Sequence, residues 1–522
     1  MQNFYETIRT LADIPDLHAS GTALIFQGRC TSYPDLSAAA NRIANAMAAQ
    51  GLTPGGRVAF LGLDSDKSYE ILFGCARAGM VFVPVNWKLN ADEMEFIVRD
   101  AECELLFVTP ETAQAAQDFR PRCPRLRAVV IVGGTAPGFA GYTDWRDAEP
   151  SSKPDRAVDP GAPVVQVYTS GTSGQPKGVV LAHSGFIDTV REIVRAGDEF
   201  IEWTAGDVTL LALPTFHVGG LWWAVQGLIN GAANVVMKTF NSAEALVAIA
   251  ELKITKLAFV PSMLRFLLSD PASATTDLSS VGLIIYGGSP MAIPLLENAQ
   301  ALFRCRFAQN YGMSETTNMA IFMPPSEHAA MTGQRRNAAG RPLRGVRIRI
   351  VDSAARDLPP GESGEIFFHT PTRMLEYWKR PEATAETLID GWIRTGDAGH
   401  IDADGYLYIT DRIKDLVISA GENIYPAELE RALLTHPGVE EVAVIGIPDR
   451  RWGEVPIAYV VPVPGSGLTK ADILAHARSH IASFKMIYDA ILIDRLPRNS
   501  TGKVLKRVLR EPHWAAQDRQ VN

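Results

Sequence analysis

The sequence predicts a mixed α/β protein with a large N-terminal domain and a smaller C-terminal domain, and three observations lead to this prediction. Short apolar runs at 57–63 and 129–132 have the length and composition of buried strands. An alanine-rich stretch at 36–49 carries its apolar residues at helical spacing, and strands that alternate with helices favour parallel sheets covered by helices. The chain has 522 residues, 47% of them hydrophobic and 21% charged, which favours more than one domain.

A different kind of unit is predicted at 346–351, where VRIRIV alternates polar and apolar residues as a half-exposed antiparallel strand does. A domain boundary is predicted near 411–415 (DRIKD), where charged residues gather. The residues downstream carry strand and helix signals of their own, at 442–447, 472–481 and 490–493. We therefore expect an N-terminal domain over 1–412 and a small α+β domain over 413–522.

Composition excludes some classes of function. The net charge of −8 and the pI near 5.8 leave no basic footprint, which argues against nucleic acid as the partner but not against a nucleotide ligand. The five cysteines are scattered without a CxxC pair, as free thiols in a reducing compartment are. The first twenty residues do not resemble a signal peptide, and no apolar run approaches the roughly 20 residues that span a bilayer. We expect a cytoplasmic protein without a transmembrane segment.

A loop rich in hydrogen-bond donors is the first functional signal. An apolar strand candidate at 164–167 is followed by YTSGTSGQPKG at 168–178, a segment that contains glycines, hydroxyl side chains and one lysine. Such a loop can surround phosphate oxygens with N–H and O–H groups, and Lys177 adds positive charge. It is not a Walker A loop, because Lys177 follows Pro176 and precedes Gly178. Composition alone leaves a plain flexible turn as the alternative.

YTSGTSGQPKGV resembles the signature loop of the adenylate-forming superfamily, which includes acyl-CoA synthetases, 4-coumarate–CoA ligases, firefly luciferase and the adenylation domains of peptide synthetases. The resemblance covers nearly the whole chain and implies α/β subdomains with a distorted β-barrel portion, followed by a small mobile α+β domain. Further blocks stand in the family's order: PTFHVGG at 214–220, YGGSP at 286–290, QNYGMSETT at 309–317, GWIRTGD at 391–397, DRIKD at 411–415, SAGENIYP at 419–426 and PRNSTGK at 497–503.

The resemblance implies an ATP site. It gives Glu315 the role of holding Mg²⁺, a hard cation that takes oxygen ligands and few carboxylates. It gives Asp397, presented on a tight glycine turn, and Arg412 the ribose contacts. The residues that the resemblance assigns to ATP are Thr169, Ser170, Gly171, Thr172, Ser173, Gly174, Lys177, Gly288, Gln309, Asn310, Tyr311, Gly312, Ser314, Asp397 and Arg412.

The C-terminal blocks imply a catalytic lysine and a hinge. A carboxylate that approaches the α-phosphate meets like-charge repulsion, and an ammonium group that bridges both offsets it. By resemblance Lys503 is this group and Lys414 is the hinge between two orientations of the small domain. The pantetheine channel would be lined by Ala420, Gly421 and Glu422, with Ala420 where many acyl-CoA synthetases have glycine.

The acid pocket follows from the same layout. By resemblance, His217 gates substrate entry or touches the carboxylate; the alternative is a structural histidine beside Phe216. Asn310 stands where many relatives have glycine, which narrows or polarises the far wall. Two adjacent tryptophans fit either an aromatic acid or a core beneath a fatty chain. The residues expected to line the pocket are His217, Trp222, Trp223, Met263, Gly287, Gly288, Asn310 and Met319.

The function predicted by this resemblance is an ATP-dependent carboxylic acid–CoA ligase that acts through an acyl-adenylate. Its substrates would be ATP with Mg²⁺, coenzyme A, and a medium- or long-chain fatty acid or a hydroxycinnamic-type aryl acid; the oligomeric state is left open, a homodimer included. The alternatives are a stand-alone adenylation enzyme that loads a carrier protein, a luciferase-like oxygenase, and a non-catalytic nucleotide- or acyl-binding protein. The joint presence of Glu315, Asp397, Arg412 and Lys503 argues against the last.

Overall fold

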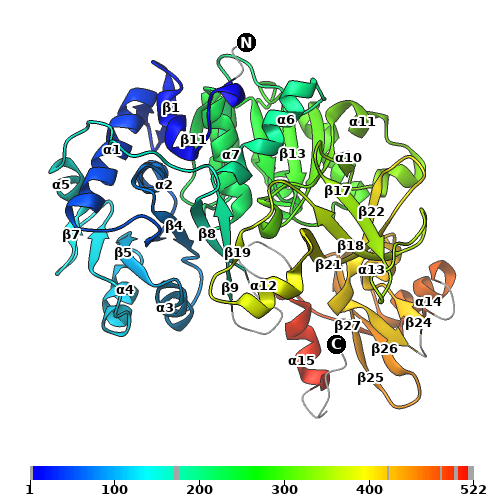
Figure 1. Ribbon diagram of the computed structural model, residues 1–522. Helices are drawn as coiled ribbons and strands as arrows, with labels where there is room; N and C mark the ends of the chain where they lie inside the picture. Colours follow the sequence, from blue (N-terminus) through cyan, green and yellow to red (C-terminus); the bar gives the residue numbers. More distant parts are fainter. Residues whose placement is uncertain (1–3, 170–175, 420–421, 482–484, 499–503, 515–522) are drawn as a thin grey trace. The chain divides into compact units, whose positions relative to one another are not determined.

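The structure, a computed structural model, describes residues 4–169, 176–419, 422–481, 485–498 and 504–514 (Figure 1). By its contacts the chain divides into two compact units. The first consists of Met1–Arg347 with Phe368–Ile393, and the second of Ile348–Phe367 with Arg394–Asn522.

An eight-stranded sheet forms one part of the first unit, in the order β19-β9-β8-β4-β3-β5-β6-β7. Its central strands pair in parallel, as the alternation of strands and helices predicts. The strands are β3 Arg57–Leu61, β4 Val81–Val85, β5 Cys103–Val108, β6 Ala128–Ile131, β7 Ala140–Gly141, β8 Pro163–Thr169, β9 Lys177–Ala182 and β19 Glu376–Tyr377. The buried strands predicted at 57–63 and 129–132 are therefore confirmed as β3 and β6.

Helices connect these strands and cover the sheet (Figure 1). Helix α1 confirms the helix predicted at 36–49 and begins earlier, because the Ser32 side chain caps it by accepting a hydrogen bond from the Asp35 N–H. One core cluster joins Ala59 and Leu106 of the sheet to Ile97 of α3 and Phe119 of α4. The helices are α1 Tyr33–Ala49, α2 Asp66–Ala78, α3 Ala91–Asp100, α4 Ala113–Phe119 and α5 Tyr142–Asp147.

A nine-stranded sheet forms the other part of the first unit, in the order β16-β15-β14-β13-β12-β10-β11-β1-β2. Strands β10, β12, β13 and β14 pair in parallel, so their carboxyl ends lie at one edge of the sheet. The strands are β1 Thr22–Phe26, β2 Arg29–Ser32, β10 Val208–Leu211, β11 Ala233–Val236, β12 Lys256–Phe259, β13 Leu283–Gly287, β14 Arg306–Tyr311, β15 Ile321–Met323 and β16 Arg341–Pro342. The remaining helices of this unit are α6 Asp188–Ala196, α7 Val218–Ile229, α8 Ser242–Leu252, α9 Pro261–Ser269, α10 Ile293–Phe303, α11 Pro325–Ala330 and α12 Pro381–Thr387.

A five-stranded sheet has most of its residues in the second unit, and the distorted β-barrel portion that the resemblance implies stays a prediction. The order of the sheet is β17-β18-β21-β20, with β22 paired to β21. The strand predicted at 346–351 is present, but its exposure does not alternate strictly, since Ile350 and Val351 are both buried. The strands are β17 Arg347–Val351, β18 Gly364–His369, β20 Leu388–Ile389, β21 Trp392–Ile401 and β22 Leu407–Arg412.

The C-terminal α+β portion has its own sheet, in the order β24-β23-β26-β25 with β27 beside β26. The segments predicted at 442–447, 472–481 and 490–493 are confirmed as parts of β25, α14 and β27. The domain boundary at 412/413 stays a prediction. The elements are β23 Val417–Ser419, β24 Glu422–Ile424, α13 Pro426–Leu433, β25 Val439–Asp449, β26 Gly453–Pro462, α14 Lys470–His480, β27 Asp489–Leu492 and α15 Lys506–Trp514.

Two expectations from composition can be compared with the structure. All five cysteines are free; Cys75, Cys103 and Cys123 are buried, whereas Cys30 is exposed. Within the described residues, no helix has both the length and the apolar character needed to cross a bilayer.

The buried His183 makes the stability of the first unit depend on pH. Its side chain is 0% exposed, and its Nδ1 accepts a hydrogen bond from the Leu11 N–H at 3.1 Å. Burial lowers the pKa of His183 from its ordinary value to about 4, so the folded chain takes up this proton less readily than the unfolded chain. We expect stability to fall as the pH drops from 6.5 towards 4, with His183 contributing about 2 kcal/mol of the loss by pH 5.

Urea unfolding at pH 7.5 and pH 5 measures this effect in the wild type and in His183→Gln. The variant should lose less unfolding free energy between the two pH values. An equal loss in both proteins would show that His183 does not cause the acid sensitivity.

Candidate active site

The carboxyl ends of four parallel strands gather the predicted acid-pocket residues. His217 follows β10 as the N-cap of α7, and Met263 follows β12 in the first turn of α9. Gly287 ends β13, and Asn310 lies near the end of β14. In open parallel sheets, ligands bind outside the carboxyl ends of the strands. Residues that lie far apart in the sequence thus share one edge of the sheet.

Glycine is required where β13 and β14 meet. Gly287 is the register partner of Asn310, and a Cβ atom at Gly287 would lie 2.3 Å from the carbonyl oxygen of Asn310. The preceding pair, Tyr286 and Gln309, is joined by a hydrogen bond of 3.0 Å from the tyrosine hydroxyl to Oε1 of Gln309. Gly288 follows with a φ of +79°, which glycine adopts freely. At Gly287, the space that a side chain would need is therefore taken by the backbone of Asn310.

Three predicted pocket residues carry buried polar atoms that have no hydrogen-bond partner within the described part of the chain. These atoms are Nε2 of His217, Nε1 of Trp223 and Oδ1 of Asn310. Buried polar groups are rarely left unpaired, so the atoms of His217 and Asn310 are available to hydrogen-bond a ligand. Burial and the positive charge of Lys88 lower the pKa of His217 to about 4. The imidazole is therefore neutral near pH 7 and can bind a carboxylate only through hydrogen bonding.

The two adjacent tryptophans face different surroundings. The ring of Trp223 lies 5.4 Å from that of Trp203, whereas Trp222 meets Phe200 edge-on at 6.4 Å. Trp222 also lines a small cavity together with Met319. Consecutive helix positions point about 100° apart, so the two rings do not form one face. Of the two, Trp222 is the one that lies beside another predicted pocket residue.

Glu315 is held by residues that lie far along the chain from it. Its side chain is 6% exposed, and the Tyr377 hydroxyl donates a hydrogen bond of 2.6 Å to its Oε1. The Met374 N–H donates to the Glu315 carbonyl oxygen at 2.8 Å. Nζ of Lys177 lies 5.1 Å from the centroid of the Tyr377 ring. Tyr377 therefore stands between the lysine of the glycine-rich loop and the predicted metal-binding carboxylate.

Sequence analysis missed Tyr377. No local pattern distinguishes it, since its position depends on β19 pairing antiparallel with β9, where Tyr377 is the register partner of Val179. The other edge of β9 pairs with β8, the strand that precedes the glycine-rich segment. Thr169 and Lys177 are register partners at its base. Ser170, Gly171, Thr172, Ser173 and Gly174 lie outside the described residues.

The two predicted ribose residues lie side by side, because Asp397 of β21 is the register partner of Arg412 of β22. The glycine before Asp397 does have a left-handed conformation, since Gly396 has a φ of +70°, but it lies within strand β21 and not in a turn between strands. The turn is at Asp390–Gly391, where both residues have positive φ and join β20 to β21. Asp397 lies within β21 and is 8% exposed. The strand pairing, rather than a turn, sets its position beside Arg412.

The C-terminal predictions are covered only in part by the described residues. Lys414 lies in a short 3₁₀ turn, Ile413–Asp415, and Glu422 begins β24. Ala420, Gly421 and Lys503 lie outside the described residues. Arg498 and Val504, on either side of 499–503, form an antiparallel bridge. The roles of these residues stay predictions.

The donor set around Glu315 fits Mg²⁺ better than a metal that requires a protein cage. Among the described residues, no three His, Cys, Asp or Glu side chains come together in a metal-binding group. Mg²⁺ is typically bound by one or two carboxylates, waters and substrate phosphates. Glu315 would supply one buried carboxylate, and Lys177 at the base of the loop would supply a cation for phosphate. These residues therefore fit an Mg²⁺ ion that arrives with a nucleotide.

Comparison with protein families and known proteins shows which family the chain belongs to. Residues 15–378 match the AMP-binding enzyme family, and residues 428–503 match the AMP-binding enzyme C-terminal domain. A fatty acid–[acyl-carrier-protein] ligase, ScoC from Streptomyces coeruleorubidus, is 44% identical over 99% of this chain and 98% of its own. A feruloyl-CoA synthase from Amycolatopsis sp is 36% identical over 94% of this chain and 95% of its own. The anthranilate–CoA ligase AuaEII, solved with anthranoyl-AMP, superposes with a TM-score of 0.88 at 25% identity and covers 98% of this chain and 99% of its own.

Proposed function

Since the chain belongs to the AMP-binding enzyme family, we propose that it joins a carboxylic acid to the thiol of coenzyme A through an acyl-adenylate. The observation that carries the proposal is the cluster of Lys177, Tyr377 and Glu315, which offers a phosphate-binding cation and a buried carboxylate within one contact network. The sheet edge with His217 and Asn310 supplies the acid side of the site.

In the first step the acid's carboxylate oxygen forms a bond to the α-phosphorus of ATP, and the bond to pyrophosphate breaks. Positioning and charge stabilisation supply most of the catalysis in such transfers. Mg²⁺ bound at Glu315 would neutralise phosphate charge there. The hydrogen bond from Tyr377 orients the Glu315 carboxylate, and Lys177 neutralises phosphate charge from the loop side. Lys503 offsets the repulsion between the carboxylate and the α-phosphate.

In the second step the thiol of the acceptor attacks the acyl carbonyl, the bond to AMP breaks, and a thioester forms. Lys414 is the proposed hinge for the change between the two steps. Ala420, Gly421 and Glu422 are the proposed lining of the pantetheine channel. AMP leaves with the phosphate oxygen that carried the acyl group.

The acid is proposed to be a medium- or long-chain fatty acid or a hydroxycinnamic-type aryl acid. Apolar side chains of Trp222, Met263 and Met319 suit either class, and the unpaired Oδ1 of Asn310 suits a substituent that donates a hydrogen bond. The names of relatives divide in the same way, into fatty acid ligases and a feruloyl-CoA synthase. We also propose that the enzyme acts in the cytoplasm.

A carrier protein is the second candidate acceptor. It is favoured by the relative at 44% identity, which is named as a ligase of fatty acids and acyl-carrier protein. The feruloyl-CoA synthase, an indoleacetate–CoA ligase and a long-chain-fatty-acid–CoA ligase are 36%, 36% and 34% identical. Both acceptors present a phosphopantetheine thiol, so the chemistry of the second step is the same for both.

Pyrophosphate release with ATP and Mg²⁺ tests the proposal over a panel of fatty and aryl acids. Each acid is assayed alone, with CoA, and with a phosphopantetheine-bearing carrier protein. Turnover that depends on one acid class and on CoA would support the main proposal. Adenylate that only the carrier protein discharges would support the second candidate. No acid-dependent pyrophosphate release across the panel would contradict both.

A further inference from the structure

Asp64 is a buried carboxylate in the loop between β3 and α2, and it is not one of the predicted nucleotide-binding residues. Its side chain is 6% exposed. Both of its oxygens accept hydrogen bonds from one residue, Thr215: the Thr215 N–H donates to Oδ2 at 3.1 Å, and the Thr215 hydroxyl donates to Oδ1. Among the described residues, no cation forms an ion pair with Asp64. Both oxygens of the carboxylate are thus hydrogen-bonded to a residue that lies 151 positions further along the chain.

Burial of the Asp64 carboxylate without an ion-pair partner does not by itself stabilise the fold. Burial raises the pKa of Asp64 to about 7, while the two hydrogen bonds from Thr215 act in the opposite direction. Removing a charge from water is unfavourable unless hydrogen bonds compensate. What the pair supplies is a fixed distance between the loop after β3 and the segment after β10.

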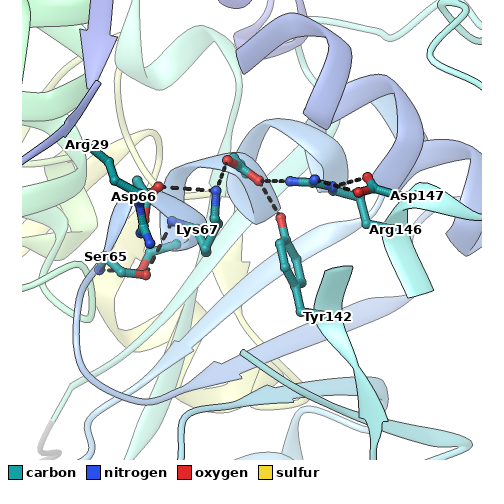
Figure 2. Close-up of polar contacts among 9 residues, drawn as sticks. Arg29, Ser65, Asp66, Lys67, Tyr142, Arg146 and Asp147 are labelled. Atoms are coloured by element: carbon teal, nitrogen blue, oxygen red, sulfur yellow. Dashed lines mark hydrogen bonds and ion pairs between the residues drawn. The ribbon is translucent and has the colours of Figure 1, made fainter. Parts of the chain in front are cut away.

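The loop that carries Asp64 is firmly anchored. Ser65, the next residue, caps α2 by accepting a hydrogen bond from the Lys67 N–H. Asp66 forms ion pairs with Arg29 at 3.0 Å and with Lys67 at 3.1 Å (Figure 2). Asp66 is 2% exposed, so these pairs hold the first turn of α2 from within.

The network continues along α2 to a second element. Glu70, also 2% exposed, accepts hydrogen bonds from Lys67, from the Tyr142 hydroxyl at 2.6 Å and from Arg146 at 2.9 Å. Tyr142 and Arg146 belong to α5, and Arg146 also pairs with Asp147 (Figure 2). The ion pairs of Asp66 and Glu70 thus fix the beginning of α2, directly after the loop that carries Asp64.

Thr215 lies in the turn that presents His217. The His217 N–H donates to the Pro214 carbonyl oxygen at 3.1 Å, and the His217 carbonyl oxygen accepts from the N–H groups of Gly220 and Leu221 to start α7. A Cβ atom at Gly220 would lie 2.3 Å from the Pro214 oxygen, so the helix packs directly on the turn. A shift of Thr215 therefore shifts His217 at the acid pocket.

We propose that Asp64 is a positioning residue for the acid substrate, which holds His217 in place through Thr215. This inference rests on the proposed function, because it assumes that the edge of the sheet bearing His217 binds the acid. Asp64 itself touches no reacting atom, and its effect reaches the substrate through the turn at 214–217. Small misplacements of a contacting group are enough to cost large factors in rate.

Steady-state kinetics of three variants, measured separately against the acid and against ATP, test the proposal. Thr215→Val removes the hydroxyl donor, Thr215→Ser keeps it, and Asp64→Ala removes both acceptors. We expect Thr215→Val and Asp64→Ala to raise the KM for the acid about 10-fold or more, with the KM for ATP within about twofold of the wild type. Thr215→Ser should restore the wild-type KM for the acid.

Thr209→Val is the matched control. Thr209 is likewise a buried threonine, on β10, and its hydroxyl donates a hydrogen bond to the Lys256 carbonyl oxygen at 3.1 Å. It should lose stability without a change in the KM for the acid. If Asp64→Ala does not fold, the two Thr215 variants decide the matter. Equal changes in both KM values, no change in either, or the same effect in Thr209→Val would overturn the proposal. A wild type without acid-dependent activity would instead contradict the proposed function.

Discussion

Replacement of Lys503 by alanine is expected to slow acyl-adenylate formation by a factor of about 10²–10³. The proposed role of Lys503 is to offset the repulsion between the acid's carboxylate and the α-phosphate, which arises only in the first step. Thioester formation from supplied acyl-adenylate should therefore keep most of its wild-type rate. Pyrophosphate release measures the first step, and thiol consumption with supplied adenylate measures the second.

Arg507→Ala provides the control for Lys503→Ala. It removes a neighbouring cation whose side chain is 76% exposed and should leave both steps near the wild-type rate. Loss of both steps in equal measure in Lys503→Ala would exclude the specific role. A comparable loss in Arg507→Ala would show that the general positive charge of this region matters instead.

The second large effect is expected at Glu315. Glu315→Gln keeps the size of the side chain and an oxygen for the Tyr377 hydroxyl but removes the negative charge that would hold Mg²⁺. We expect kcat/KM for ATP with Mg²⁺ to fall on the order of 10²-fold, with partial recovery at high Mg²⁺ concentration. Titration of the adenylation rate with Mg²⁺ at saturating ATP measures the change in metal dependence.

The Tyr377→Phe variant tests the orientation of the Glu315 carboxylate separately from its charge. It removes the 2.6 Å hydrogen bond to Glu315 and leaves the carboxylate, so the apparent Mg²⁺ affinity should fall about 10-fold, less than in Glu315→Gln. The exposed neighbour Glu376→Gln should behave as the wild type. A Tyr377→Phe enzyme with unchanged Mg²⁺ dependence would mean that the hydrogen bond does not act on the metal site.

Local patterns were sufficient for much of the fold. The apolar run at 57–63 and the helical spacing at 36–49 each correspond to one element, β3 and α1, because the interactions that select strand or helix act between near neighbours in the sequence. The position of Asp397 shows the limit of such reasoning. The glycines beside it suggested one turn, but the pairing of β21 with β22 placed the residue within a strand.

The tryptophan pair shows the same limit at the acid pocket. Adjacent positions in the sequence suggested a shared role for Trp222 and Trp223. The packing of α7 instead turns Trp223 toward Trp203 and leaves Trp222 beside Met319 at a small cavity. Which face of a buried helix meets a ligand depends on the elements around it, and a helix that is apolar on all sides carries little signal of this in its own sequence.

By itself the sequence determined the α/β class, the resemblance to adenylate-forming enzymes and the residue types that suit phosphate, Mg²⁺ and a carboxylate. These features depend on local periodicity and on short sequence motifs. Only the tertiary structure decided that Tyr377 meets Glu315 and that Asp64 meets Thr215, pairs separated by 62 and 151 positions. The physical reason is that such contacts arise from strand register and from the packing of loops at the edge of a sheet. Both are set by the burial of the whole core, and neither leaves a pattern in the residues nearby.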